Sequence, residues 1–190
     1  MSYRGKPCVV LAVSGSVAAY KACEVASKLT QAGVQVRVAL TRSAAQMVTP
    51  LLFRAITGNP AAASEFESDA EAPMLHIDLA QTADLFLVAP ASAATIGRLA
   101  LGLAEDLVSS AALVLGPKTP RAVAPAMNPN MWSAPPVRAN VALLKQHGWD
   151  VLEPGSGWTA CGVEGTGRLV EPGEIVAYAL SKIGRKAKKK

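Results

Sequence analysis

The stretch Cys8-Val-Val-Leu-Ala-Val-Ser-Gly-Ser-Val-Ala18 decides the fold of this chain. Its first six residues are apolar throughout, which is typical of a central strand in a parallel sheet covered on both faces. Small and hydroxyl-bearing residues follow, and residues 17–32 are predicted to form a helix that ends at Gly33. In a doubly wound sheet, such a strand–turn–helix unit is where phosphate binds, because small residues let the backbone come close to the phosphate and the start of the helix offers N–H donors. An ordinary strand–helix turn has the same composition, so the turn alone leaves both interpretations open.

Strands and helices continue to alternate along the chain. Further strands are predicted at residues 35–40, 84–89, 121–124 and 150–152, and further helices at 92–101, 107–115, 135–147 and 172–183. This alternation predicts an α/β fold with a doubly wound parallel sheet and right-handed crossovers. No linker or repeat interrupts the pattern, so we expect a single domain over residues 1–183, followed by a basic tail at 184–190. Residues 58–73 are predicted to be a surface loop. Residues 155–172, which are rich in glycine, are predicted to be a mobile flap without strand or helix.

Composition and charge exclude several classes of protein. Of 190 residues, 51% are hydrophobic and 17% charged, which argues against disorder. Apolar runs such as residues 107–115 are too short to span a bilayer, and the first residues lack the core of a signal peptide, so we expect a cytoplasmic protein without a membrane partner. Three cysteines without a CxxC pair argue against a disulfide framework and against a metal site. The net charge of +5 comes mostly from the last nine residues, which contain Lys182, Arg185, Lys186, Lys188, Lys189 and Lys190. We therefore expect no nucleic-acid partner.

Two further turns narrow the choice of ligand. The first turn is not a GxGxxG motif, and the strand at 35–40 ends in Leu40-Thr-Arg-Ser43 rather than in an acidic residue that would bind a ribose. These hydroxyls and this cation favour a mononucleotide phosphate over NAD. The strand at 84–89 ends in Ala89-Pro-Ala-Ser-Ala-Ala-Thr95, which is again small and hydroxyl-bearing before a helix. Two such turns at the carboxyl ends of neighbouring strands predict one shared crevice.

A set of motifs then resembles a known family. Pro90-Ala-Ser-Ala-Ala-Thr95, Pro125-Ala-Met-Asn-Pro-Asn-Met-Trp132 and Ala160-Cys-Gly-Val-Glu-Gly-Thr-Gly-Arg168 occur in this order, with His76 upstream in His-Ile-Asp-Leu-Ala80. The set resembles the flavin-containing cysteine decarboxylases, which include phosphopantothenoylcysteine decarboxylase and the peptidyl-cysteine decarboxylases of lantibiotic and thioviridamide-type pathways. The resemblance covers residues 9–175. It implies a flavodoxin-like, Rossmann-like three-layer sandwich, with FMN bound between the subunits of a homotrimer that stacks in some members into a dodecamer.

The resemblance also implies roles for individual residues. His76 and Cys161 would be catalytic. Asn128 would hold the substrate carboxylate, and the substrate site would also contain Met131, Gly165, Gly167 and Arg168. FMN would be bound by Gly15, Ser16, Val17, Thr41, Ser43, Ser92, Ala93, Ala94, Thr95, Ala126 and Met127. One residue departs from the family pattern, because Ala94 replaces an asparagine of the usual motif.

Taken singly, several of these residues would be assigned structural roles. A lone histidine is more often a surface residue or a core residue whose hydrogen bonds are satisfied, and we assign His147 such a structural role. Cys8 and Cys23, in a strand and a helix, are expected to be structural, and Trp132 is expected to belong to the core. A lone Cys161 would more often be a small buried hydrophobe, but its glycine-rich surroundings argue for exposure.

The expected chemistry is consistent with these residues. Loss of CO2 from a cysteine leaves electrons on the α-carbon, and a flavin that oxidises the thiol to a thioaldehyde supplies the required electron sink. His76 has a suitable intrinsic pKa to take the thiol proton. Asn128, a neutral amide, can hold the carboxylate without a salt bridge that would stabilise the ground state. A closing flap would exclude water from the reactive product.

Two substrates remain in competition. Cys161 in its flap favours phosphopantothenoylcysteine, for which this cysteine returns a proton while the reduced flavin returns electrons. A chain of 190 residues with an altered motif at Ala94 favours instead a free-standing enzyme that converts the C-terminal cysteine of a precursor peptide to an aminoenethiol, and we lean to this peptide substrate. A non-catalytic flavoprotein subunit is less favoured because His76 and Asn128 are both present. A flavin prenyltransferase would lack the motif at residues 125–132.

Overall fold

The computed structural model describes residues 5–66 and 74–187, with only the backbone of residues 185–187. Six parallel strands form one sheet in the order β3-β2-β1-β4-β5-β6. Their bounds are β1 (Cys8–Val13), β2 (Gln35–Leu40), β3 (Ala61–Ala62), β4 (Leu85–Ala91), β5 (Arg121–Pro125) and β6 (Asp150–Val151). The strand order reverses between β1 and β4, so the predicted doubly wound parallel sheet is confirmed.

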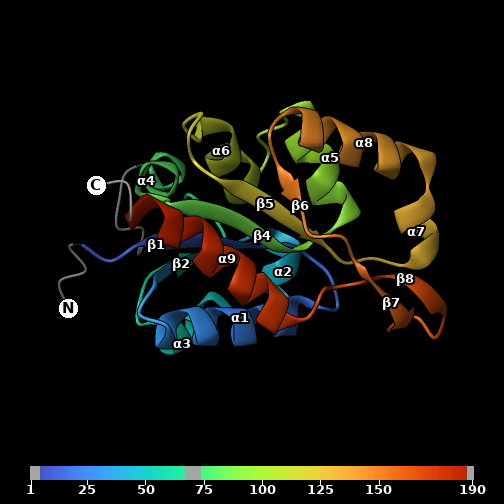
Figure 1. Cartoon of the computed structure of the whole chain (residues 1–190), viewed down its shortest axis with the longest axis horizontal. Coiled ribbons are helices and arrows are strands. Elements are labelled where there is room, and N and C mark those ends of the chain that lie inside the picture. Colours follow the sequence, from blue (N-terminus) through green and yellow to red (C-terminus); the bar gives the residue numbers. More distant parts are fainter. Residues whose placement is uncertain (1–4, 67–73, 188–190) are drawn as a thin grey trace.

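Helices cover both faces of the sheet, which explains why the central strands are apolar throughout. In β1, Val9 and Leu11 pack into the core on one face, whereas Val10 and Ala12 pack into the core on the other. The first face carries α1 (Ala19–Gln31), α2 (Arg42–Ala45), α3 (Pro50–Thr57) and α9 (Pro172–Ala187). The second carries α4 (Leu75–Thr82), α5 (Ala93–Leu101), α6 (Leu107–Val114) and α8 (Pro135–Gln146). The resulting three layers are visible in Figure 1.

Side-chain caps define where several helices begin. The hydroxyl of Thr49 accepts a hydrogen bond from Leu52 N–H at the start of α3, and Gly58 ends this helix in the left-handed conformation. Asp106 and Ser109 form a capping box at the start of α6. The α3 helix was not predicted, although Thr49, Pro50 and Gly58 are recognisable start and stop residues in the sequence.

Two of the predicted loops contain strands. The prediction of a surface loop over 58–73 is wrong at β3, a buried edge strand that pairs with β2; residues 67–73 of that loop lie outside the described residues. The prediction of no regular structure over 155–172 is also wrong. Here β7 (Gly155–Trp158) and β8 (Glu164–Arg168) form an antiparallel hairpin. Because the hairpin is rich in glycine, it lacks the alternation of apolar and polar residues by which strands are recognised. Backbone pairing between the two strands holds it in a regular structure.

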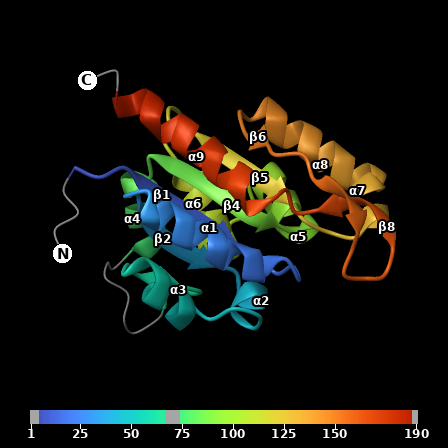
Figure 2. The ribbon, with the colours of Figure 1, turned by 60° about the horizontal axis from the view of Figure 1, so that its bottom comes forward.

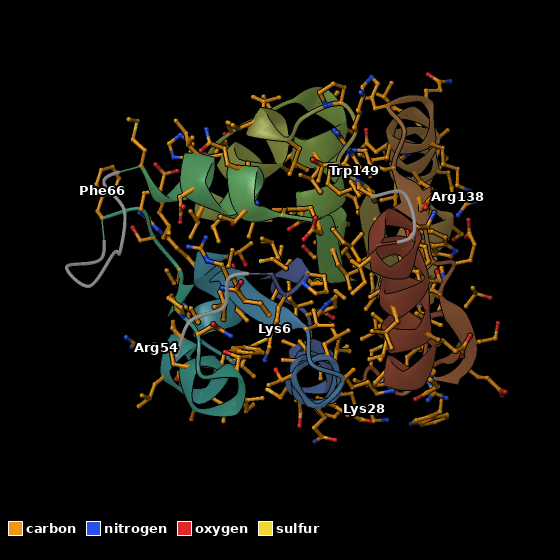
Figure 3. The ribbon with its side chains drawn as sticks, turned by 60° about the vertical axis from the view of Figure 1, so that its left-hand side comes forward. Lys6, Lys28, Arg54, Phe66, Arg138 and Trp149 are labelled. Carbon is orange, nitrogen blue, oxygen red and sulfur yellow. The ribbon has the colours of Figure 1, made fainter. Side chains whose placement is uncertain are left out.

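The hairpin and α4 lie on opposite sides of the molecule. In Figures 1 and 2 the hairpin and the short helix α7 (Pro129–Ser133) lie together at one end, beyond the carboxyl ends of the strands, while α4 lies near the other end. Trp149 is buried against Phe86 in an edge-to-face contact, whereas Phe66 is 92% exposed at the periphery (Figure 3). The α9 helix continues to Ala187, into the predicted basic tail. No helix of the described ranges is long and apolar enough to cross a membrane.

Candidate active site

A buried serine joins the two central strands where the strand order reverses. The hydroxyl of Ser14, which is fully buried, donates to Pro90 O (2.8 Å) and accepts from Ser92 N–H (2.7 Å). The turn after β1 and the turn after β4 are therefore held against each other. This is the position at which an open α/β sheet binds its ligand. Sequence analysis missed Ser14, whose partners lie more than 70 residues away.

Replacing Ser14 by alanine is expected to lower the free energy of unfolding by about 1–2 kcal/mol, because the partly buried Ser92 N–H loses its acceptor and the buried Ser14 site loses its hydroxyl. A urea titration followed by circular dichroism would measure the loss. Ser27→Ala is the matched control, since Ser27 makes an exposed bond to Gln31 within one helix. Equal stability of the two variants would contradict the role assigned to Ser14.

Small residues bring further hydroxyls to the same edge. Ser16 Oγ donates to Ala126 O at 3.2 Å, which connects the first turn to the end of β5. Thr41 begins α2 by accepting a hydrogen bond from Ala44 N–H at 3.2 Å. A Cβ atom on Gly15 would lie 2.5 Å from Ser43 Cβ, so only glycine permits this close approach. The structure thus brings the predicted phosphate-binding residues of three strands together.

The residues at this edge fit a flavin mononucleotide. At the start of α5 the cap from Ser92 reaches Thr95 N–H, so the N–H groups of Ala93 and Ala94 in its first turn remain available to a phosphate. In α1, by contrast, Ala19 N–H and Lys21 N–H already donate to Ser16 O and Ala18 O. Ala94 is exposed in that first turn of α5. Val17 is 65% exposed beside the first turn and offers apolar surface to a flat ring system.

The thiol of Cys161 lies between two polar side chains. Asn128 begins α7, where its Oδ1 accepts from Asn130 N–H (2.8 Å) while its Nδ2 donates to Cys161 Sγ (2.9 Å). Thr159 Oγ1 lies 3.0 Å from the same sulfur. The hydrogen bonds from Thr159 and then Asn128 lower the pKa of the Cys161 thiol below its ordinary value. Cys161 is exposed, as predicted, and Thr159 is a contact that sequence analysis missed.

Two glycines hold the hairpin against the turn after β5. Met127 N–H donates to Gly167 O at 2.9 Å, and a Cβ on Gly167 would collide with Met127 O. A Cβ on Gly165 would lie 2.9 Å from the ring carbons of Pro129. Backbone and proline ring can yield little, so glycine is required at both positions. The predicted substrate residues Asn128, Gly165 and Gly167 are therefore in direct proximity.

His76 is not part of this arrangement within a single chain. It lies at the start of α4, which packs on α6 and β1, whereas α7 packs on α8 and β8 (Figure 1). Its Nδ1 atom is 3.0 Å from Glu65 Oε2, although the approach is not aligned for a hydrogen bond. Sequence analysis had no means of finding Glu65, because the contact is made across a loop.

Comparison with known proteins identifies the family. A family model described as Flavoprotein matches residues 2–184. The chain belongs to the flavoprotein family.

Two curated relatives of this flavoprotein illustrate the range of chain lengths. The chain is 44% identical over 171 residues to the coenzyme A biosynthesis bifunctional protein CoaBC of Bacillus subtilis (strain 168). This match covers 90% of the chain and 42% of CoaBC. The chain is 42% identical over 168 residues to the probable phosphopantothenoylcysteine decarboxylase of Streptococcus mutans serotype c, covering 88% of the chain and 94% of that protein. The flavoprotein thus spans less than half the length of its bifunctional relative.

Solved structures confirm the predicted resemblance to flavin-containing cysteine decarboxylases. A PPC decarboxylase variant complexed with pantothenoylaminoethenethiol has a TM-score of 0.84 and 32% identity, and the match covers 92% of this chain and 96% of that one. An FMN-dependent cysteine decarboxylase from thioviridamide biosynthesis has a TM-score of 0.78 and 31% identity, over 95% and 99% of the two chains. The flavodoxin-like fold expected from the resemblance is therefore confirmed.

The remaining predicted residues of the flavoprotein have varied surroundings. Arg168 contacts Glu171 at 3.4 Å, and Glu171 also binds Lys21 of α1. Met131 is 47% exposed near the thiol-bearing hairpin, whereas Trp132 is buried, as expected for a core residue. A cavity of about 300 Å³ lies elsewhere, among Arg98, Arg121, His147 and Trp149, and contains none of the predicted site residues. The described residues contain no cluster of three or more His, Cys, Asp or Glu side chains suited to a metal ion.

Proposed function

We propose that this flavoprotein is an FMN-dependent phosphopantothenoylcysteine decarboxylase. The observation that carries the proposal is the Cys161 thiol held at 2.9 Å from the Asn128 amide, because a thiol beside the carboxylate-binding residue can return a proton to the substrate. The relative from Streptococcus mutans, matched over 94% of its length, supports the same substrate. The comparisons thus favour the alternative substrate over the peptide to which the sequence analysis leaned.

FMN would be held at the carboxyl edge by the turns containing Gly15, Ser16 and Ser92, with Thr41 and Ser43 near its phosphate. When bound, FMN supplies reversible two-electron oxidation of the substrate thiol. Val17, Ala126 and Met127 would border its ring system. The first turn of α5 would donate N–H groups to the phosphate.

The chain's own residues would carry out the binding and proton steps. One hydrogen of Asn128 Nδ2 is already directed at Cys161, and the other is available to the substrate carboxylate. The carboxylate departs as CO2, and the Cys161 thiol gives its proton to the carbon that has lost it. The net reaction exchanges CO2 for one proton. His76 would take the proton of the substrate thiol.

The site would be completed by a second copy of the chain. Within one chain α4 lies far from the hairpin, so His76 would reach the crevice of a neighbouring protomer (Figure 2). Apolar side chains are exposed on both sides that would meet: Met74 and Phe66 near His76, and Val17 and Met47 near the crevice. These surfaces support contact between copies of the chain, and the homotrimer and dodecamer stay predictions from the family resemblance.

The proposal is tested by the mass of the product. Purified protein with its flavin is incubated either with phosphopantothenoylcysteine or with a peptide that ends in cysteine. We expect phosphopantothenoylcysteine to lose CO2 alone. In Cys161→Ser, we expect the product to have lost CO2 and two hydrogens, because no thiol returns the proton. If only the peptide reacts, losing CO2 and two hydrogens, the enzyme is instead a peptidyl-cysteine decarboxylase, a class represented among its structural neighbours.

A further inference from the structure

The turn between β7 and β8 places a buried hydroxyl against the exposed thiol of Cys161. Thr159 is 8% exposed, and its Oγ1 lies 3.0 Å from Cys161 Sγ and 2.5 Å from Val163 O. The backbone closes the same turn, since Thr159 N–H donates to Val163 O and Gly162 N–H donates to Thr159 O. The hydroxyl is therefore held in place by the backbone of the turn.

The single proton of the Thr159 hydroxyl can point in different directions when Cys161 is a thiol and when it is a thiolate. Thr159 has one hydroxyl proton and two neighbours that can accept it. When Cys161 is protonated, the hydroxyl can donate to Val163 O and leave the S–H free to point at a substrate. When Cys161 is a thiolate, the hydroxyl can rotate and donate to Sγ, while Val163 O keeps its bond from Thr159 N–H. The thiolate then has two side-chain donors, Thr159 and Asn128.

We propose that Thr159 is a positioning residue that stabilises the thiolate of Cys161 by rotation of its hydroxyl, and so makes Cys161 a stronger proton donor. The first half of the proposal rests on the geometry of the turn alone. The second half rests on the proposed decarboxylase function, in which the Cys161 proton passes to the substrate carbon.

A purely structural role for Thr159 makes a different prediction. If the hydroxyl only closes the turn through Val163 O, its removal affects stability but not the ionisation of the thiol. Thr159→Val keeps the shape of the side chain and removes the hydroxyl, whereas Thr159→Ser keeps the hydroxyl. Thr166→Val is the matched control, because Thr166 bonds Ser156 (2.8 Å) on the same hairpin without contacting the sulfur.

The test is the rate of alkylation of Cys161 by iodoacetamide between pH 6 and pH 10, in the full-length protein as purified. Sulfur displaces iodide and the thiol proton goes to water, so the rate reports the thiolate. Mass spectrometry of the Cys161 peptide separates it from the other two cysteines. Burial raises the pKa of Cys8 to about 11 and also raises the pKa of Cys23, so neither competes near neutral pH.

In Thr159→Val we expect alkylation at pH 7 to be roughly fivefold slower, with the pH midpoint moved upward. Thr159→Ser and Thr166→Val should resemble the wild type. An unchanged pH midpoint in Thr159→Val would overturn the proposal. Circular dichroism of each variant checks that it is folded, so that a change in alkylation rate is not caused by unfolding.

The same variants separate this proposal from the proposed function. Alkylation needs no substrate, so a shifted midpoint supports thiolate stabilisation even if the wild type does not decarboxylate phosphopantothenoylcysteine. If the wild type does, Thr159→Val should release more product lacking two hydrogens, because proton return is slower. A shifted midpoint without this change in product would overturn the role of Thr159 in proton donation.

Discussion

The His76→Asn variant is expected to decarboxylate its substrate about 10²–10⁴-fold more slowly than the wild type, because it loses the group that would take the thiol proton. It should retain its flavin, since the predicted cofactor residues lie at the carboxyl edge of the sheet and His76 lies on α4. Product formation by mass spectrometry and the visible absorbance of the flavin measure the two properties. His147→Asn is the matched control, because His147 is the other histidine and is exposed after α8. Full turnover by a flavin-loaded His76→Asn protein would remove His76 from the reaction.

Mixing two inactive variants tests whether the site is shared between protomers. His76→Asn supplies an intact hairpin and Asn128→Leu supplies an intact histidine. Random assembly of equal amounts should restore about one quarter of the interfaces, those in which wild-type His76 faces wild-type Asn128. We expect co-expressed mixtures to recover activity that neither variant has alone. Failure of assembled mixtures to recover any activity would contradict a shared site.

Gly167→Ala is expected to have the largest structural effect. The added Cβ would collide with Met127 O, and neither the backbone of the hairpin nor that of the turn after β5 can move aside without breaking their hydrogen bond. We expect a loss of about 3 kcal/mol in the free energy of unfolding. Displacement of the hairpin would also separate Cys161 from Asn128, so decarboxylation should fall at least tenfold in protein that remains folded.

Gly155→Ala provides the control for this prediction. Gly155 belongs to the same hairpin, but a Cβ at this position would meet no atom within 4 Å. Its stability in urea and its activity should match the wild type. If Gly167→Ala behaved like Gly155→Ala in both measurements, the close docking of the hairpin on Met127 would be contradicted.

The glycine-rich segment shows why part of the site escaped prediction. The strands β7 and β8 contain glycine, serine and threonine and lack the apolar alternation by which strands are recognised. Their order comes from pairing with each other and from docking on the turn after β5, neither of which has a local pattern. The α3 helix differs, because Thr49 and Gly58 mark its ends in the sequence and could have revealed it.

The sequence by itself determined the strand–turn–helix units, the covered parallel sheet and the family resemblance, because each depends on neighbouring residues or on a contiguous motif. The apolar run of β1 and the cap at Ser92 are of this kind. Only the tertiary structure decided that Ser14 bonds the turn after β4, that Thr159 and Asn128 both contact Cys161, and that His76 lies away from them. Apart from the local contact of Thr159, these relations join segments far apart in the chain. They depend on the order and crossing of strands, which no local hydrogen bond or periodicity encodes.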